Sequence, residues 1–496
     1  MVGERDQKFR EIAARMAAAL PQADLDVVPS AGHAVHLVTR SGELPGDAPP
    51  GVSVDRALAP PLLAPAAVAG EPVADHLSHA AAVHRAVTEI HEREHVDAVL
   101  APLWCCEGVV CGLDERFPTV VSCMTSMATI EELRGSAGPD REAAQLIALE
   151  RGTIRRARYA HGLTERALEK TLADYGAEPA ETAVVGRGLS DRAQARNAVP
   201  DGADPPLVLF VGRLERRKGV DVLFEAAKRL AADDVRFSLV LVGPDSEDTD
   251  TGEPYRLRFE REAGRDRALA GRVHFAGAVA DDELDRLYGR ADVVCAPSRF
   301  ESHGIVLVEA MMHGRAIVTC DAGGVPEVVE EGGNALLARP GDPDSLADCL
   351  RRVVGDSELR RRLGARSRAL FEERFEAGQV GPRMAGFLAR VARAHRAAPT
   401  AAEDLRERLA AVIQEVLPVD SATAAGAAAE LIEPSAASWR AAALAAAGER
   451  DAWQARALEA ERQREAAEAS IDRLSGSRAW RITRPLRRAA SVLRRS

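Results

Sequence analysis

The sequence has few aromatic residues, no long apolar run and no repeated spacing of cysteines. Phe, Trp and Tyr together make up 4% of the 496 residues. No run of about eighteen apolar residues occurs, so no segment is expected to span a membrane. The seven cysteines are scattered, a pattern typical of buried thiols in a reducing cytoplasm rather than of disulfides.

Excess positive charge is also missing from the chain as a whole. The formal net charge is -11, which argues against nucleic acid as a partner because such proteins need a basic surface. The first twenty residues mix both signs of charge and have no apolar centre, so we expect no signal peptide. We therefore expect a cytoplasmic protein.

Short apolar runs alternate with helical stretches from residue 207 onward. The strand candidates are 207–213, 237–243, 272–277, 293–298, 316–321 and 335–341. The helix that follows the last of them has Asp342 as a predicted N-cap and Pro343 at its first position. This alternation predicts a parallel sheet with helices on both faces.

The first 198 residues follow a similar but less regular pattern. Strand candidates are 33–40, 96–104 and 117–124, and helices are expected at 73–95 and 141–158. The intervening segment 44–72 is rich in proline and is expected to be irregular. We predict an α/β fold with two Rossmann-like domains and a helical, Ala- and Arg-rich C-terminal extension.

Changes in composition divide the chain into five expected parts. The two domains meet near 197–206, and a helix after the second domain is expected to cross back to the first. The expected parts are 1–198 (first domain), 199–375 (second domain), 376–397 (crossing helix), 398–475 (helical or coiled extension) and 476–496 (basic amphipathic tail).

Residues 299–311, RFESHGIVLVEAM, carry two carboxylates that bracket an apolar run. Glu301 is expected in the loop after a strand, and the helix that begins after Gly304 offers free amides and a positive dipole end to a pyrophosphate. Glu309 lies more than one turn into that helix, where a carboxylate can accept hydrogen bonds from the diol of a ribose. As an isolated pair, the two glutamates would instead be interpreted as ordinary solvated carboxylates.

A second candidate cluster is GRLERRKG at 212–219. Arg213 and Lys218 follow a predicted strand, where both cations can reach one diphosphate. Taken alone, this run of charges is equally typical of an exposed surface. A further glycine loop, AGGVPEVV, opens another predicted helix near residue 325.

Together these motifs resemble the family-4 retaining glycosyltransferases of GT-B architecture. The matching elements occur in order: GRL and KG, then LVG, FAG, FES with LVEAM and HG, and AGGVPEVV. The resemblance is dense over about 207–375 and loose before it. It implies transfer of a sugar from a nucleotide diphosphate sugar (UDP- or GDP-linked) with retention of configuration, without a bound metal or other cofactor. The second domain would then bind the donor, and the first would bind a glycan, lipid-linked or small-molecule acceptor.

The resemblance also implies roles for individual residues. Glu301 would be the catalytic carboxylate that contacts the donor sugar near the reacting centre, and His303 beside it would contact the same sugar. Glu309 would bind the ribose. The remaining donor-binding groups would be the cations Arg213 and Lys218, on the diphosphate, and the backbone amides of Gly304, Ile305 and Val306.

The chain departs from the family pattern at several places. The usual first strand and its Gly-Gly loop have no counterpart before residue 33, which indicates a truncated or degenerate first domain. Met124 stands where the family often has His, Arg187 replaces His or Asn, and His303 occupies a usually aromatic position. These departures keep open an alternative function, a GT-B-like binding or scaffold protein with impaired turnover.

One motif points to different chemistry. HEREH, at 91–95, matches the H-E-x-x-H signature of zinc proteases. The predicted helix ends at once into a strand and no third ligand is apparent, so we interpret the motif as a chance match rather than a zinc hydrolase site.

The C-terminal segment SRAWRITRPLRRAASVLRRS contains seven arginines, no acidic residue and one tryptophan. Interleaved Arg and apolar residues are typical either of a disordered basic end or of a segment that lies on an anionic membrane. We predict that 477–496 binds such a surface, which would place the protein peripherally on the inner face of the membrane.

Overall fold

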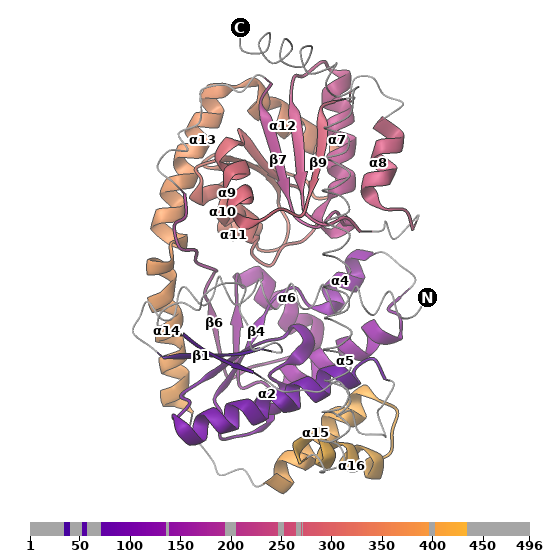
Figure 1. Ribbon diagram of the computed structural model, residues 1–496, viewed down its shortest axis with the longest axis vertical. Coiled ribbons are helices and arrows are strands. Elements are labelled where there is room, and N and C mark those ends of the chain that lie inside the picture. The colour runs from indigo at the N-terminus through magenta and orange to yellow at the C-terminus, as the bar shows by residue number, and fades with distance from the viewer. Residues whose placement is uncertain are drawn as a thin grey trace, which may run out of the picture. The chain divides into compact units, whose positions relative to one another are not determined.

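The computed structural model describes residues 34–39, 52–56, 71–134, 138–193, 205–246, 252–263, 269, 271–395 and 402–433 (Figure 1). Its strands form a two-stranded, a four-stranded and a six-stranded sheet, and every neighbouring pair of strands is parallel. Among the described residues, no helix is long and apolar enough to cross a bilayer.

The six-stranded sheet has the order β12-β11-β10-β7-β8-β9. Its strands are β7 (Leu207–Val211), β8 (Ser238–Val242), β9 (Val273–Gly277), β10 (Val293–Ala296), β11 (Ala316–Cys320) and β12 (Ala335–Ala338). All six lie within runs that the sequence predicts as strands. The strand order reverses between β7 and β10, and ligands of such sheets bind outside the carboxyl ends of the strands at this point.

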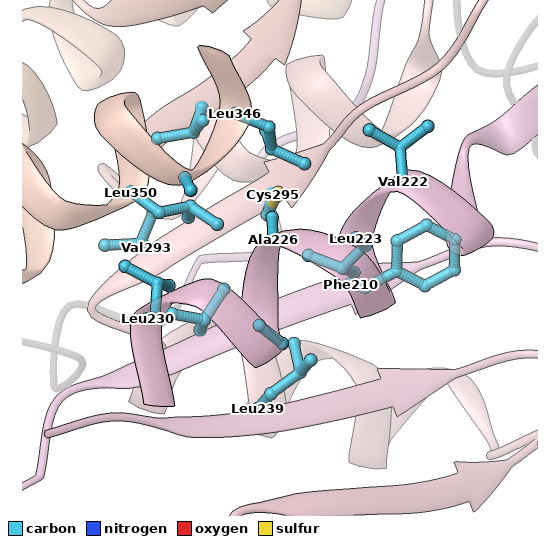
Figure 2. Packing of buried hydrophobic residues seen from close by; sticks show 14 of the residues in the cluster. Phe210, Val222, Leu223, Ala226, Leu230, Leu239, Val293, Cys295, Leu346 and Leu350 are labelled. Carbon is cyan, nitrogen blue, oxygen red and sulfur yellow. The ribbon is translucent and has the colours of Figure 1, made fainter. Parts of the chain in front are cut away.

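Helices cover both faces of this sheet. They are α7 (Val220–Ala232), α8 (Tyr255–Ala263), α9 (Asp281–Arg290), α10 (Ile305–Met312), α11 (Val325–Val328), α12 (Pro343–Gly355) and α13 (Ser357–Leu370). In Figure 2, side chains of α7 and α12 gather over the strands that carry Phe210, Leu239, Val293 and Cys295. Leu209 and Val294, which are sequence neighbours of these residues, belong instead to a cluster with α10. Alternate residues are thus buried on opposite faces, which explains the continuous apolar runs.

The predicted start of α12 is confirmed. Asp342 is the N-cap, and its side chain accepts hydrogen bonds from the amides of Asp344 and Ser345, each at 3.0 Å. Pro343 occupies the first helical position, where its missing amide hydrogen costs no hydrogen bond.

The four-stranded sheet has the order β3-β4-β5-β6. Its strands are β3 (Val99–Pro102), β4 (Thr119–Cys123), β5 (Tyr159–Gly162) and β6 (Glu181–Val184). The helical elements of this half are α2 (Ala74–Arg93), η2 (Trp104–Cys106), α3 (Val109–Leu113), α4 (Met127–Arg134), α5 (Arg141–Arg156) and α6 (Glu165–Tyr175). The strands β5 and β6 are not predicted from the sequence, because each has only four residues and β5, YAHG, lacks β-branched residues.

The remaining sheet pairs β1 (Val35–Thr39) with β2 (Val52–Arg56). The expectation that 44–72 is irregular throughout is therefore wrong at β2. Its sequence, VSVDR, contains β-branched valines, and pairing with β1 supplies its backbone hydrogen bonds. Residues 1–33, in which the sequence shows no counterpart of the family's first strand and Gly-Gly loop, lie outside the described residues.

After α13, the π-helical turn η4 (Phe371–Phe375) leads into α14 (Ala377–Ala394). Val380, Met384 and Phe387 of α14 belong to one buried cluster with Val120 of β4 and Tyr159 of β5. The helix α14, which follows the six-stranded sheet in the chain, therefore packs on the four-stranded sheet.

Two further helices, α15 (Ala402–Val416) and α16 (Ser421–Ile432), pack against each other and against α2, α3 and α5. Arg156 of α5 forms an ion pair with Glu415, and Arg408 forms one with Glu115. The start of the expected extension is thus part of the folded unit. Its remainder and the basic tail lie outside the described residues.

Candidate active site

Two loops meet at the carboxyl ends of β7 and β10. The first contains the 3-10 turn η3 (Arg216–Lys218) and ends at Gly219, whose φ is +71°. A Cβ on Gly219 would stand 1.9 Å from the carbonyl oxygen of Pro297 in the second loop. Glycine is required here because it adopts a positive φ and lets the two backbones approach. This approach carries Lys218 to the second loop.

The side chains of Lys218 and Glu301 form the centre of the site. Nζ of Lys218 lies 2.5 Å from Oε1 of Glu301, and the hydroxyl of Ser298 donates to the same oxygen at 2.8 Å. A guanidinium nitrogen of Arg217 lies 3.7 Å from Oε2. Glu301 is 9% exposed, so this carboxylate is satisfied by two cations and a hydroxyl rather than by bulk solvent.

The charges of this cluster are set by burial and by each other. Burial would raise the pKa of Glu301, but Lys218 and Arg217 lower it to about 2. Burial also lowers the pKa of Lys218, an effect that Glu301 opposes. Glu301 is therefore ionised at neutral pH.

Arg299 fastens the two loops together. Its guanidinium donates to both carboxylate oxygens of Asp221, at 2.7 and 2.6 Å, and to the carbonyl oxygen of Arg216 at 2.6 Å. Its amide donates to the carbonyl oxygen of Arg217 at 2.8 Å. A bidentate Arg–Asp pair has a fixed geometry, so Arg299 holds η3 beside β10.

Arg213 lies at the edge of this cluster. It pairs with Glu215 at 3.2 Å, and Glu215 also accepts from Arg217 at 2.9 Å. Burial lowers the pKa of Arg213. The structure thus brings Arg213, Arg217 and Lys218 into one basic group, although only Lys218 contacts Glu301 closely.

The helix α10 begins at Ile305, four residues after Glu301. Gly304 is its N-cap with φ +81°, and the carbonyl oxygen of Gly304 accepts from the amide of Leu307 at 2.8 Å. The amides of Ile305 and Val306 lie in the first turn, where no helical carbonyl can pair with them. The positive end of the helix therefore stands next to the carboxylate–cation cluster.

Glu309 lies farther along α10 and does not contact the cluster. Its carboxylate accepts a hydrogen bond from the hydroxyl of Tyr288, on α9, at 2.7 Å. Glu309 is half-buried, and removal from water raises its pKa. The ring of Tyr288 stacks on His313, whose Nε2 lies 3.2 Å from Asp285. No ligand contact is needed to satisfy Glu309 in this conformation.

His303 is buried against other parts of the chain. It is 2% exposed, its Nε2 accepts from the amide of Arg187 at 3.3 Å, and its ring meets Phe375 edge to face. Burial and the charge of Arg187 lower the pKa of His303 to about 3, so the ring is neutral. A donor-sugar contact for His303 stays a prediction, and these contacts favour a packing role.

Two residues that depart from the family pattern meet each other. A guanidinium nitrogen of Arg187 lies 3.4 Å from the sulfur of Met124, which follows β4. Nearby, Thr164 donates to the carbonyl oxygen of Ser302 at 2.7 Å. The loop that contains Glu301 thus touches residues from the four-stranded half.

Sequence reasoning missed Arg217, Ser298 and Arg299. Arg217 is one of five charged residues in RLERRK, and Ser298 is the last residue of the predicted strand 293–298, two residues beyond β10. The HEREH motif crosses the end of α2, which stops at Arg93, so His95 lies beyond the helix. Within the described ranges, no group of three or more His, Cys, Asp or Glu residues is arranged to hold a metal ion.

Comparisons with known proteins agree with this geometry. Residues 191–370 match the family model described as Glycosyl transferases group 1. The alpha-D-kanosaminyltransferase of Streptomyces kanamyceticus is 30% identical over 181 residues, which are 36% of this chain and 45% of that protein. The D-inositol 3-phosphate glycosyltransferase of Corynebacterium efficiens is 36% identical over 160 residues, or 32% and 37% of the two chains. The chain thus spans less than half the length of these curated relatives.

Similarity to solved structures identifies the fold of the chain. The sucrose-phosphate synthase of Thermosynechococcus elongatus has a TM-score of 0.59 at 22% identity, over 78% of this chain and 94% of that one. The lipopolysaccharide glycosyltransferase WaaG has a TM-score of 0.53 at 18% identity, over 74% and 94%. Both likenesses agree with two Rossmann-like domains in a GT-B arrangement. Residues 191–370 of this chain are therefore similar to the group 1 glycosyl transferases, and the rest of the chain shares with the solved structures only the fold.

Proposed function

We propose that the protein transfers a sugar from a nucleotide diphosphate sugar to a hydroxyl acceptor, with retention of configuration and without a metal ion. The observation that carries this proposal is the Lys218–Glu301–Arg217 cluster beside the N-terminus of α10. It lies at the strand-order reversal, where α/β sheets bind nucleotides.

The chemistry of the leaving group explains why cations are needed. When the bond from the sugar to the diphosphate breaks, negative charge grows on the diphosphate and positive charge grows on the sugar ring. Cations fixed in advance and a helix N-terminus stabilise the departing diphosphate without reorganisation. In this proposal Lys218, Arg213 and Arg217 supply that charge, and the amides of Gly304, Ile305 and Val306 bind phosphate and sugar oxygens.

Glu301 has two roles in this proposal. Its ionised carboxylate positions Lys218, and it faces the donor sugar, where it stabilises the developing positive charge. The contact with Lys218 supports the first role directly. Glu309 is proposed to accept from the ribose diol, which would require its hydrogen bond from Tyr288 to be shared.

The donor base and the acceptor are proposed only by class. UDP and glucose occupy a solved structure of Anabaena HepE, which has a TM-score of 0.50 and 22% identity over 62% of this chain and 81% of that one, and the proposed donors are UDP- or GDP-sugars. The proposed acceptor is a glycan, a lipid-linked molecule or a small molecule bound by the first half. We place the reaction in the cytoplasm, with the basic tail at the membrane.

The test combines binding and turnover. UDP- and GDP-sugars are screened by thermal shift, because a ligand that binds only the folded state raises the melting temperature. Stabilising donors are then incubated with acceptor pools in EDTA, and the anomeric configuration of the product is determined by NMR. Transfer that requires added metal, or a product with inverted configuration, contradicts that part of the proposal.

The second candidate is a binding protein without turnover. The Arg187–Met124 contact and the buried His303 favour it, because they fill positions that the family pattern gives to other residue types. A donor that raises the melting temperature but is neither transferred nor hydrolysed would support this candidate.

A further inference from the structure

A cavity of about 270 Å³ lies on the four-stranded half, away from the candidate active site. Its lining comes from residues 108–159 together with His395 and Arg408, and includes none from 205–375. Thr119 and Tyr159, the first residues of β4 and β5, line it, so the cavity is at the amino ends of these strands. The loop that carries Glu301 instead touches Thr164, beyond the carboxyl end of β5.

The hydroxyl of Tyr159 has no hydrogen-bond partner among the described residues, although this side chain lines the cavity and the residue is only 2% exposed. A buried polar group without a partner destabilises the fold, so a ligand that binds this hydroxyl would be favoured. The cavity is far larger than the roughly 10–15 Å³ needed to hold one water. There is room for a small organic molecule.

His395 adds a hydrogen-bond acceptor to the same cavity. Its Nε2 donates to the carbonyl oxygen of Glu115 at 2.8 Å, which in a neutral ring leaves Nδ1 as a lone pair. Within the described part of the chain, Nδ1 is buried and has no partner. A hydroxyl group of a ligand would satisfy it.

Three arginines make the wall of the cavity basic. The guanidinium carbon of Arg158 lies 5.5 Å from the centroid of the Tyr159 ring, and none of the ion pairs formed by the described residues includes Arg158. Arg156 and Arg408 also line the cavity and are paired with the part-exposed Glu415 and Glu115. Pairs of this exposure contribute little, so they leave the arginines able to attract a further anion.

Two acidic residues, Asp114 and Glu115, also line the cavity, and neither cancels the charge of Arg158, because Glu115 is paired with Arg408 and Asp114 has partners of its own. Asp114 accepts from His84 at 2.8 Å and from Arg116 at 2.7 Å, and these partners lower its pKa although burial would raise it. The groups still able to bind are therefore a hydroxyl donor, a free guanidinium and an imidazole acceptor.

We propose that this cavity is a second binding site, for a small anion that also carries a hydroxyl group, such as a polyol phosphate. The phosphate would accept from Tyr159 and Arg158, and a ligand hydroxyl would donate to Nδ1 of His395. The site joins the starts of β4 and β5 to the end of α14 and to α15. A ligand bound in the cavity therefore stabilises the packing of α14 and α15 on the four-stranded sheet. This effect does not depend on whether the protein transfers sugars.

The probes are sn-glycerol 3-phosphate, inorganic phosphate and glycerol, titrated at constant ionic strength by thermal shift. The full chain carries Arg213→Ala and Lys218→Ala, which removes two of the three cations proposed to bind phosphate at the other site. We expect a saturable rise in melting temperature with glycerol 3-phosphate, a weaker one with phosphate and none with glycerol. Equal responses to glycerol 3-phosphate and phosphate contradict the hydroxyl contact.

Tyr159→Phe, introduced into the Arg213→Ala and Lys218→Ala chain, tests directly whether the Tyr159 hydroxyl binds the ligand. It removes only a hydroxyl that has no partner among the described residues, so the chain should fold at least as well as its parent. We expect the affinity for glycerol 3-phosphate to fall about tenfold, the loss of one hydrogen bond to a charged group, and Arg158→Gln to act alike. Tyr255→Phe, a buried change on α8, should have no effect on affinity. No saturable shift, or one unchanged in Tyr159→Phe, overturns the site.

Discussion

The ammonium group of Lys218 lies 2.5 Å from the carboxylate of Glu301, although the two residues are 83 positions apart in the chain. They follow β7 and β10, which are neighbours only because the strand order of the sheet reverses between them. The fold thus assembles an ion pair at the place where an α/β sheet accepts a nucleotide. The proposed function depends on this pair.

The cations of the site are predicted to recognise phosphate rather than the nucleoside. Arg213→Ala and Lys218→Ala should each weaken binding of a nucleoside diphosphate by about tenfold or more, because each removes a charge-assisted contact. Binding of the matching nucleoside should change little. Isothermal titration with both ligands checks this, with Lys228→Ala on the outer part of α7 as a control. Equal losses for both ligands would show that these cations do not face the diphosphate.

Glu309 is predicted to bind the ribose of the donor. Glu309→Ala should weaken binding of the ribonucleotide by roughly 100-fold, since two hydrogen bonds to a charged acceptor are lost. Binding of the 2′,3′-dideoxy analogue should be nearly unchanged, and this comparison controls for any effect on folding. If the two ligands lose affinity alike, Glu309 supports α9 through Tyr288 and does not bind the ribose.

The approach of the two loops is predicted to depend on Gly219. Gly219→Ala adds a Cβ that would stand 1.9 Å from the oxygen of Pro297, at a φ of +71°. We expect a loss of about 1–3 kcal/mol in the free energy of unfolding, together with loss of donor binding, because Lys218 would be displaced. Gly176→Ala is the matched control, since its φ is +59° and no atom lies within 4 Å of the added Cβ. Similar losses in the two variants would argue against a special role for the loop contact.

The basic tail is predicted to bind anionic membranes. Its seven arginines each add about 1 kcal/mol near such a surface, and Trp480 suits the headgroup region. The full chain should sediment with anionic liposomes at low salt, and a chain ended at Leu474 should not. Binding that survives the truncation, or that salt does not weaken, would refute this prediction.

Most strands of the second half of the fold could be predicted from the sequence because they are buried on both faces. Such strands are continuous apolar runs, as LVLFV and AIVTC are, and the helices between them carry clear caps such as Asp342. The strands β2, β5 and β6 could not be predicted from the sequence, since they are short and each pairs with a strand that is distant in the sequence. Tertiary pairing outweighs local propensity in such strands.

The site was partly predictable for a similar reason. Glu301, Lys218 and Gly304 follow strands and lie in spaced motifs, so their place at one edge of the sheet could be inferred. The role of Arg217 could not, because nothing in RLERRK distinguishes it from its neighbours. The hydrogen bond from Tyr288 to Glu309 joins two helices, and only the packed structure reveals it.

The most direct test of the central claim is the rate of nucleotide diphosphate release by Glu301→Gln. The change keeps the shape of the side chain and removes the charge that faces the donor sugar in the proposed reaction. With a donor identified by thermal shift, kcat should fall by about 100-fold or more while the affinity for the donor changes by less than about threefold. Glu225→Gln, a change at a partly exposed position on α7, should leave both unchanged. Turnover in Glu301→Gln equal to that of the unaltered protein would contradict the account.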